Sequence, residues 1–151
     1  MPKETIVMEI EAPCETVFDL IHDYNQRLKW DSMLSKAFIL GDAQAAGKGV
    51  RTRCVGKWSS GKLALETEYV NFERGRIAAV KLTGRTPFFA HFAASIRHEP
   101  VTETRSRVIY VYSFRAGPKA LAFLLEPIMN VFLRSETKAR LQSLRDFLER
   151  E

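Results

Sequence analysis

The chain has 151 residues, enough for one domain with a substantial hydrophobic core, and we expect a single domain over 1–151. Its composition, 46% apolar and 27% charged, is typical of a soluble globular protein. The longest apolar stretch, ALAFLLEPIMNVFL, contains Glu126 and Pro127, which argues against integral membrane association. Because the N-terminal MPKETIVMEIEA enters an alternating pattern almost at once, we expect no signal peptide and a cytoplasmic location.

The net charge of +5, from 23 basic and 18 acidic residues, permits two interpretations. It would suit an acidic partner such as RNA or a ribosome surface. The basic residues are spread through RTRCVGK, RGR, RSR and KAR, however, with acidic residues between them. We therefore favour a solvated, mildly basic exterior and expect no DNA partner.

The N-terminal region predicts one strand and two helices. Residues 6–11 alternate, with Ile6, Met8 and Ile10 on one side. Pro13 then suits the first turn of a helix over CETVFDLIHDY, and Glu15 suits its positive end. His22 is expected at the solvated end of that helix, and a short second helix is expected over 26–32.

From residue 35 to residue 115 the pattern is that of β-structure, with turns at GDAQAAGKG, SSG, ERGR and HEPVTE. The connections are too short for crossover helices, so the sheet should be antiparallel. The expected strands are 35–42, 49–58, 61–72, 76–84, 88–98 and 104–115.

The pattern of apolar and charged residues over 49–72 predicts how the two strands of this hairpin pair. With Ser59–Ser60 as a two-residue turn, an apolar face and a charge-paired face form together, as expected of a sheet with one solvated side. Near the turn, Lys57 would face Lys62, which is a mismatch. The expected pairs are Trp58 with Gly61, Cys54 with Leu65, Thr52 with Thr67, Arg53 with Glu66 and Arg51 with Glu68.

Later strands predict an inward face rich in aromatic residues. In the last strand one parity is apolar, and the other carries Arg105, Arg107 and Arg115. The residues expected to face inward are Phe88, Phe92, Ile96, Val108, Tyr110, Tyr112 and Phe114.

Gly117–Pro118 ends the sheet, and the rest of the chain is predicted to be helical. Pro127 should kink or divide this helix, because it removes a backbone hydrogen bond. The stretch 121–133 is apolar almost all round, so that half should be surrounded by other structure. A second stripe follows, formed by Leu133, Thr137, Leu141, Leu144 and Leu148.

The order β-α-α-β6-α, with a long terminal helix lying across about seven antiparallel strands, is an α+β helix-grip arrangement. IEAPCETVFDLIHDYNQRLKWDSML, GVRTRCVGKW, ETEYVNFERGRIAAVK and LLEPIMNVFLRSETKARL together resemble the polyketide cyclase/dehydrase branch of the SRPBCC superfamily, which includes START lipid-transfer domains and the birch-pollen-allergen fold. This resemblance implies a hydrophobic pocket between a curved sheet and the terminal helix. It implies little about function, because members share a cavity rather than a catalytic motif.

The predicted inward residues would suit such a pocket, although the same residues could form a solid core. Tyrosines fit an amphipathic ligand because each offers an apolar ring and one polar group. The expected ligand-binding residues are Trp30, Trp58, Tyr69, Phe92, Tyr110, Tyr112, Met129 and Phe132.

Support for catalysis is limited to tyrosines. Tyr110 and Tyr112 are the candidates, as weak acids or as groups that orient a carbonyl. Lys81 would face inward only if Ile77 does, whereas Val80 favours the opposite register. No metal or cofactor is expected, since His22, His91 and His98 lack ligand spacing, and no phosphate loop precedes a helix. Cys14 and Cys54 are expected to be free thiols.

Three functions remain open. The first is binding of a hydrophobic or amphipathic small molecule such as a lipid, polyketide or quinone, by a monomer or homodimer. The second is a polyketide cyclase-like enzyme that uses pocket tyrosines. The third is an interaction protein of the ribosome or of chaperones, as some relatives with this fold are.

The segment DYNQRLKWDSML would close one end of the sheet in this fold. Trp30 is then expected to anchor this cap against the terminal helix or the end of the cavity. Asp31 could cap a turn or pair with Arg27 or Lys29, and we expect it to be solvated rather than catalytic.

Overall fold

A computed structural model describes residues 2–56, 63–84 and 86–150. The described residues form three helices, a short 3₁₀ turn and seven strands. Their order is β1 (Lys3–Ile10), α1 (Cys14–His22), α2 (Arg27–Trp30), β2 (Leu34–Ile39), β3 (Arg51–Gly56), β4 (Ala64–Glu73), β5 (Ile77–Leu82), β6 (Phe89–Thr102), β7 (Arg105–Ala116), η2 (Lys119–Leu121) and α3 (Ala122–Glu149).

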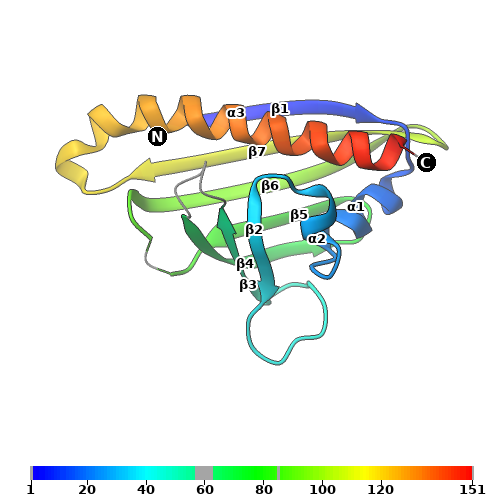
Figure 1. The fold of residues 1–151 in the computed structure, drawn as a ribbon, viewed down its shortest axis with the longest axis horizontal. Coiled ribbons are helices and arrows are strands. Elements are labelled where there is room, and N and C mark those ends of the chain that lie inside the picture. The colour runs from blue at the N-terminus through cyan, green and yellow to red at the C-terminus, as the bar shows by residue number, and fades with distance from the viewer. Residues whose placement is uncertain (1, 57–62, 85, 151) are drawn as a thin grey trace.

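The strands form one antiparallel, curled sheet in the order β1-β7-β6-β5-β4-β3-β2. Helix α3 lies along β1 and β7, and α1 and α2 close one end of the sheet (Figure 1). This is the predicted α+β helix-grip fold. The core lies between the concave face of the sheet and the three helices, where Ile10, Val17, Tyr112, Phe114 and Leu144 are buried.

The register predicted for the 49–72 hairpin is confirmed where the chain is described. β3 and β4 pair Thr52 with Thr67 and Cys54 with Leu65 on the inward side. The charge-paired side is confirmed too, with Arg51 opposite Glu68. The predicted pairs of Trp58 with Gly61 and of Lys57 with Lys62 lie outside the described residues. Cross-strand pairing of opposite charges was therefore a reliable guide to register here.

The prediction for Phe88 is wrong. Its side chain is exposed and its backbone has a φ of 72°, whereas Phe89 is buried. An irregularity in the β6–β7 pairing between Phe89 and His91 shifts the alternation by one residue, so that Phe92 again faces inward. In β5, Val80 faces the core and Lys81 is exposed, as the Val80 register required.

Helix α3 continues from Ala122 to Glu149 with Pro127 inside it, so of the two predicted outcomes, a kink or a division, the division does not occur. The prediction that its first half is surrounded is wrong, because the buried residues of α3 are Thr137, Leu141 and Leu144, all in the second half. Among the residues described, no helix is both long and apolar enough to cross a membrane.

Candidate functional site

A cavity of about 100 Å³ lies between the sheet and α3. Four of the residues predicted to bind a ligand line it, namely Phe92, Tyr110, Tyr112 and Phe132. The two tyrosines stand on β7, two residues apart, because alternate residues of a strand face the same side. The remaining lining residues are Met33, Leu34, Cys54, Gly56, Leu63, Leu65, Phe89, Leu133, Glu136, Thr137 and Arg140.

A second, inner cavity of about 60 Å³ lies beneath α1 and α2. Tyr110 lines both cavities, and Tyr69 lines the inner one together with Arg27. The two cavities are therefore neighbours on the concave face of the sheet. Each is smaller than the pockets of roughly 300 Å³ or more that usually hold drug-sized ligands.

Two predicted ligand-binding residues, Trp30 and Met129, do not line either cavity. Trp30 is buried in the hydrophobic core with Leu141 and Leu144, and its Nε1 donates a hydrogen bond to the Leu20 carbonyl at 3.3 Å. Met129 is half-buried and packs against the same core. Trp58 lies outside the described residues.

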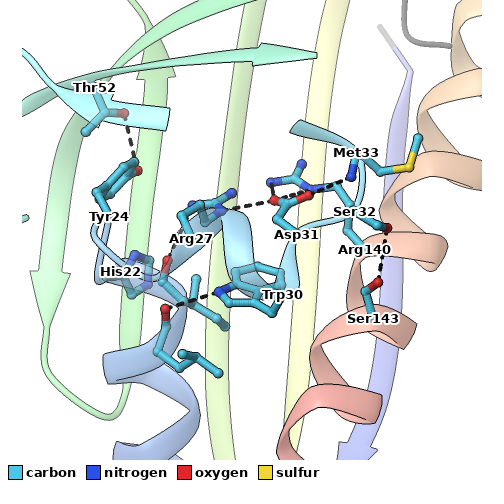
Figure 2. A network of polar contacts seen from close by, with 12 residues as sticks. His22, Tyr24, Arg27, Trp30, Asp31, Ser32, Met33, Thr52, Arg140 and Ser143 are labelled. Carbon is cyan, nitrogen blue, oxygen red and sulfur yellow. Dashed lines mark hydrogen bonds and ion pairs between the residues drawn. The ribbon is translucent and has the colours of Figure 1, made fainter. Parts of the chain in front are cut away.

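Asp31 is the centre of a buried charge cluster (Figure 2). Its Oδ2 accepts hydrogen bonds from Arg27 Nε and Arg140 Nε, each at 3.0 Å, and its Oδ1 accepts one from the Met33 amide at 3.2 Å. The prediction that Asp31 is solvated is wrong, because only 1% of it is exposed. The predicted pairing with Arg27 is confirmed.

This cluster sets the ionisation of the carboxyl group. Burial alone would raise the pKa of Asp31, but the charges of Arg140 and Arg27 outweigh it and hold the pKa below its ordinary value. Arg27 also lies over the rings of Tyr24 and Trp30, at 5.6 and 5.1 Å from their centroids. Two guanidinium groups thus share one carboxylate, and Arg140 reaches the cavity from this cluster.

His22 is also buried, contrary to the prediction that it lies at a solvated helix end. A chain of hydrogen bonds connects it to β4 and β3. Tyr24 Oη donates to Thr52 Oγ1 at 3.3 Å. A phenol has one hydrogen, so in the 3.1 Å contact Tyr69 Oη must donate to Tyr24 Oη. His22 Nδ1 must then donate to Tyr69 Oη, at 2.7 Å.

The tautomer of His22 follows from this chain. Burial, together with Arg27 and His98, lowers the pKa of His22 to about 3, so the ring is neutral near pH 7. With the hydrogen on Nδ1, Nε2 carries a lone pair, and it has no hydrogen-bond partner among the residues described. Burial raises the pKa of Tyr69, so this phenol keeps its hydrogen and acts as a relay donor.

Tyr112 is held in place by α3. Its Oη donates to Asn130 Oδ1 at 3.1 Å, and Asn130 Nδ2 donates to Glu4 Oε1 at 3.1 Å. Burial raises the pKa of Tyr112 to about 12, so at neutral pH it is a hydrogen-bond donor rather than a base. The cavity therefore offers apolar and aromatic walls with hydroxyl, thiol, guanidinium and carboxyl groups.

A larger hollow of about 610 Å³ lies on the other side of His22, between α1, β2 and the loop after β2. Phe38, Phe72 and the ion pair of Asp19 with Arg74 contribute to its walls. None of the predicted ligand-binding residues that the structure describes lines it. His22 and Tyr24 line both this groove and the inner cavity, so the two are neighbours.

Two of the three arginines of β7, Arg105 and Arg107, form ion pairs with carboxylates. Arg105 contacts Glu9 and Glu11, and Arg107 contacts Glu9 and Glu99. Acidic residues therefore accompany Arg105 and Arg107 on this surface, as their interleaving in the sequence predicts. Within the described ranges, no group of three or more His, Cys, Asp or Glu side chains is placed to hold a metal ion, and both cysteines are free.

Arg140 is one of the cavity residues that were not predicted from the sequence. It falls on the helical stripe of Leu133, Thr137 and Leu144, where a charged residue on a buried face is unusual. A charged residue on this apolar stripe was therefore the sequence feature that could have indicated a buried polar contact. Its partner Asp31 is 109 residues away, so the pair itself could not be recognised from spacing.

Residues 1–149 match the family described as "Polyketide cyclase / dehydrase and lipid transport". The chain belongs to this family. The match extends over nearly the whole domain, in agreement with the resemblance carried by the sequence. No curated protein sequence matches the chain.

Several solved structures share the fold at low sequence identity. The Zhui aromatase/cyclase from Streptomyces sp. R1128 has a TM-score of 0.80 and 15% identity, over 99% of this chain and 94% of that one. A START superfamily protein from Mycobacterium smegmatis has a TM-score of 0.77 and 12% identity, over 98% and 97%. For the di-domain aromatase/cyclase BexL of the BE-7585A biosynthetic pathway these values are 0.78 and 13%, and the chain covers 47% of that protein.

Proposed function

We propose that the protein binds an amphipathic small molecule with an aromatic or polycyclic body in the cavity between the sheet and α3. The observation that carries this proposal is the convergence of Phe92, Tyr110, Tyr112 and Phe132 on one cavity that Arg140 also reaches. The apolar body would lie against the rings, and an oxygen-bearing end would accept hydrogen bonds from Tyr110 or Arg140.

The small volume means that a polycyclic ligand must displace part of the wall. Phe132 is the best candidate to move, because it lines the cavity and is also partly exposed on the outer side of α3. On this proposal Phe132 swings outward as the ligand enters, while the sheet side stays fixed. Tyr69 and the inner cavity would extend the site once Tyr110 is in contact with the ligand.

Two substitutions on α3 test the site without removing a charge. Leu133→Trp places a large ring in the cavity, whereas Leu124→Trp places the same ring on the exposed side of the helix. The probe is anilinonaphthalene sulfonate, whose rings and sulfonate resemble the proposed ligand class, with native mass spectrometry of the purified protein in parallel. We expect Leu133→Trp to lower probe affinity by about tenfold or more, and Leu124→Trp to leave it near that of the wild type. Equal affinities in the two variants would exclude this cavity as the site.

A cyclase activity is the second candidate function, supported by the family description and by the two aromatase/cyclase structures. Tyr110 would be the group that orients or protonates a substrate carbonyl, because it reaches both cavities. Tyr110→Phe should then lower turnover of an aromatic polyketide precursor much more than it lowers probe affinity, because Arg140 and the aromatic walls remain. Retained turnover in this variant would remove Tyr110 from the mechanism.

A further inference from the structure

The first half of α3 has its polar and apolar sides reversed relative to an ordinary surface helix. Its large apolar side chains face solvent, although a helix that covers a core normally buries them. We define the apolar face of α3 as these residues together with the preceding turn: Leu121 (47% exposed), Phe123 (74%), Leu124 (56%), Ile128 (70%), Val131 (73%) and Phe132 (41%).

The polar side chains of the same turns point toward the sheet instead. Glu126 Oε2 accepts a hydrogen bond from the Ala116 amide at 2.9 Å. Asn130 accepts one from Tyr112 and donates one to Glu4. Met129 and Leu133 still pack against the core, but the exposed apolar face of this segment is too large to be scattered surface residues.

The exposed charges around this face are mainly basic. Lys119 is exposed at its N-terminal end, and Arg134 and Lys138 are exposed one to two turns beyond Val131, although Arg134 also pairs with Glu4 at 3.6 Å. From 117 to 138 the acidic residues are Glu126, which is engaged with Ala116, and Glu136, which lines the cavity. Apolar residues that include phenylalanine, bordered by lysine and arginine, are the pattern of helices that lie in the interface of anionic membranes.

We propose that the apolar face of α3 docks on the surface of an anionic lipid membrane. Phe132 belongs both to this face and to the cavity wall, so docking would bring the cavity beside the lipid. Docking does not depend on what the cavity binds. The helix lies on the membrane and does not cross it, in keeping with the absence of a spanning helix among the residues described.

A second copy of the chain fits this face less well. If two copies paired their α3 helices antiparallel, centred on Ile128, Lys119 of one copy would approach Lys138 of the other. Arg134 of one copy would approach the first turn of α3 in the other copy, near its Lys119. Such contacts bring like charges together as the apolar side chains meet. An anionic lipid surface instead satisfies both the apolar and the basic residues.

Vesicle flotation tests the proposal, with vesicles of phosphatidylcholine and phosphatidylglycerol in equal parts against vesicles of phosphatidylcholine alone. The wild-type protein should float with the anionic vesicles and should be released by salt. The triple variant Leu124→Gln/Ile128→Gln/Val131→Gln should have an affinity for the anionic vesicles that is lower by about tenfold or more, because it removes apolar area. Its fold should persist, since these side chains are exposed and glutamine favours helix.

The matched control is Val7→Gln/Val101→Gln, which removes exposed apolar side chains from β1 and β6 and should bind as the wild type does. Lys119→Glu/Lys138→Glu should lose the preference for anionic vesicles. The proposal is overturned if the wild type does not float, or if the triple variant floats equally well. It is also overturned if sedimentation shows a dimer that the triple variant abolishes while vesicles are not bound, because the face then belongs to a second copy.

Both proposals can be judged separately. The triple variant leaves the cavity lining intact and should retain the probe affinity of the cavity, whereas Leu133→Trp should lose that affinity and still float. Loss of both properties in either variant would mean that the cavity and the apolar face are one site.

Discussion

Arg140 and Asp31 connect the two ends of the chain, because the Arg140 guanidinium donates to Asp31 Oδ2 from Nε at 3.0 Å (Figure 2). The same oxygen accepts from Arg27, so removal of the carboxylate leaves two guanidinium groups without their shared counter-charge. A second link, from Ser143 Oγ to Ser32 Oγ at 3.0 Å, lies beside the first. The α1–α2 cap is thus fastened to the terminal helix by polar contacts.

The first prediction concerns this carboxylate. Asp31→Asn should lower the free energy of unfolding by about 3–5 kcal/mol, because it leaves buried cations unpaired. Arg140→Gln should cost less, since Arg27 still neutralises Asp31 and the Arg140 side chain is partly exposed. Urea unfolding followed by tryptophan fluorescence measures both. Asp146→Asn, on the exposed side of α3, is the control and should change stability little; an equal loss in the control would show that the buried cluster is not the cause.

The second prediction concerns acid stability. Burial lowers the pKa of His98 from 6.5 to about 4 in the folded state. The unfolded chain therefore binds a proton at higher pH than the folded chain does, so stability is fully present above pH 6.5 and is lost as pH falls toward 4. Between pH 7 and pH 5 the loss from this residue should be about 2 kcal/mol.

His98→Leu tests that loss directly. The variant should be at least as stable as the wild type at pH 7, because both ring nitrogens of His98 lack partners among the residues described. It should also lose less stability on going from pH 7 to pH 5. His91→Gln, an exposed position on the same strand, should keep the wild-type pH dependence. An unchanged pH dependence in His98→Leu would show that His98 does not titrate with folding.

The third prediction concerns Trp30. Trp30→Ala should destabilise the protein by about 3–5 kcal/mol, because it opens a cavity in the core. Trp30→Phe should cost about 1 kcal/mol, mainly for the hydrogen bond to Leu20, because most of the packing remains. If Trp30 anchors the end of the ligand site, the alanine variant should also release the probe faster than the phenylalanine variant does. Equal release rates would leave Trp30 with a purely structural role.

Sequence reasoning succeeded where the determinants were local or paired across neighbouring strands. The register of β3 and β4 was predicted from Arg51 opposite Glu68 and Arg53 opposite Glu66, and the structure confirms it. Alternation alone failed at Phe88, because the irregular pairing after Phe89 inserts a residue into the count. Such an irregularity has no sign in the alternation itself.

Burial of polar residues could not be predicted in the same way. His22 and Asp31 resemble solvated residues at helix ends, and their partners Tyr69 and Arg140 come from β4 and α3. Only the tertiary fold brings these groups together. The prediction that the first half of α3 is surrounded was wrong for a related reason. An apolar stripe shows that a helix needs a neighbour, but it does not show whether the same chain supplies that neighbour.

The hydrogen bonds that hold the first half of α3 to the sheet also determine how easily that segment unfolds locally. Residues around Glu126 and Asn130 are held to the sheet by hydrogen bonds, whereas the second half buries Thr137, Leu141 and Leu144. Backbone amides of 124–132 should therefore exchange with deuterium sooner than those of 137–145, through a local opening that leaves the core folded. Amide exchange followed by mass spectrometry would show it, and uniform protection along α3 would contradict it. The terminal helix would then be two cooperative units in one continuous helix, of which the outer one can detach while the inner one keeps the cap in place.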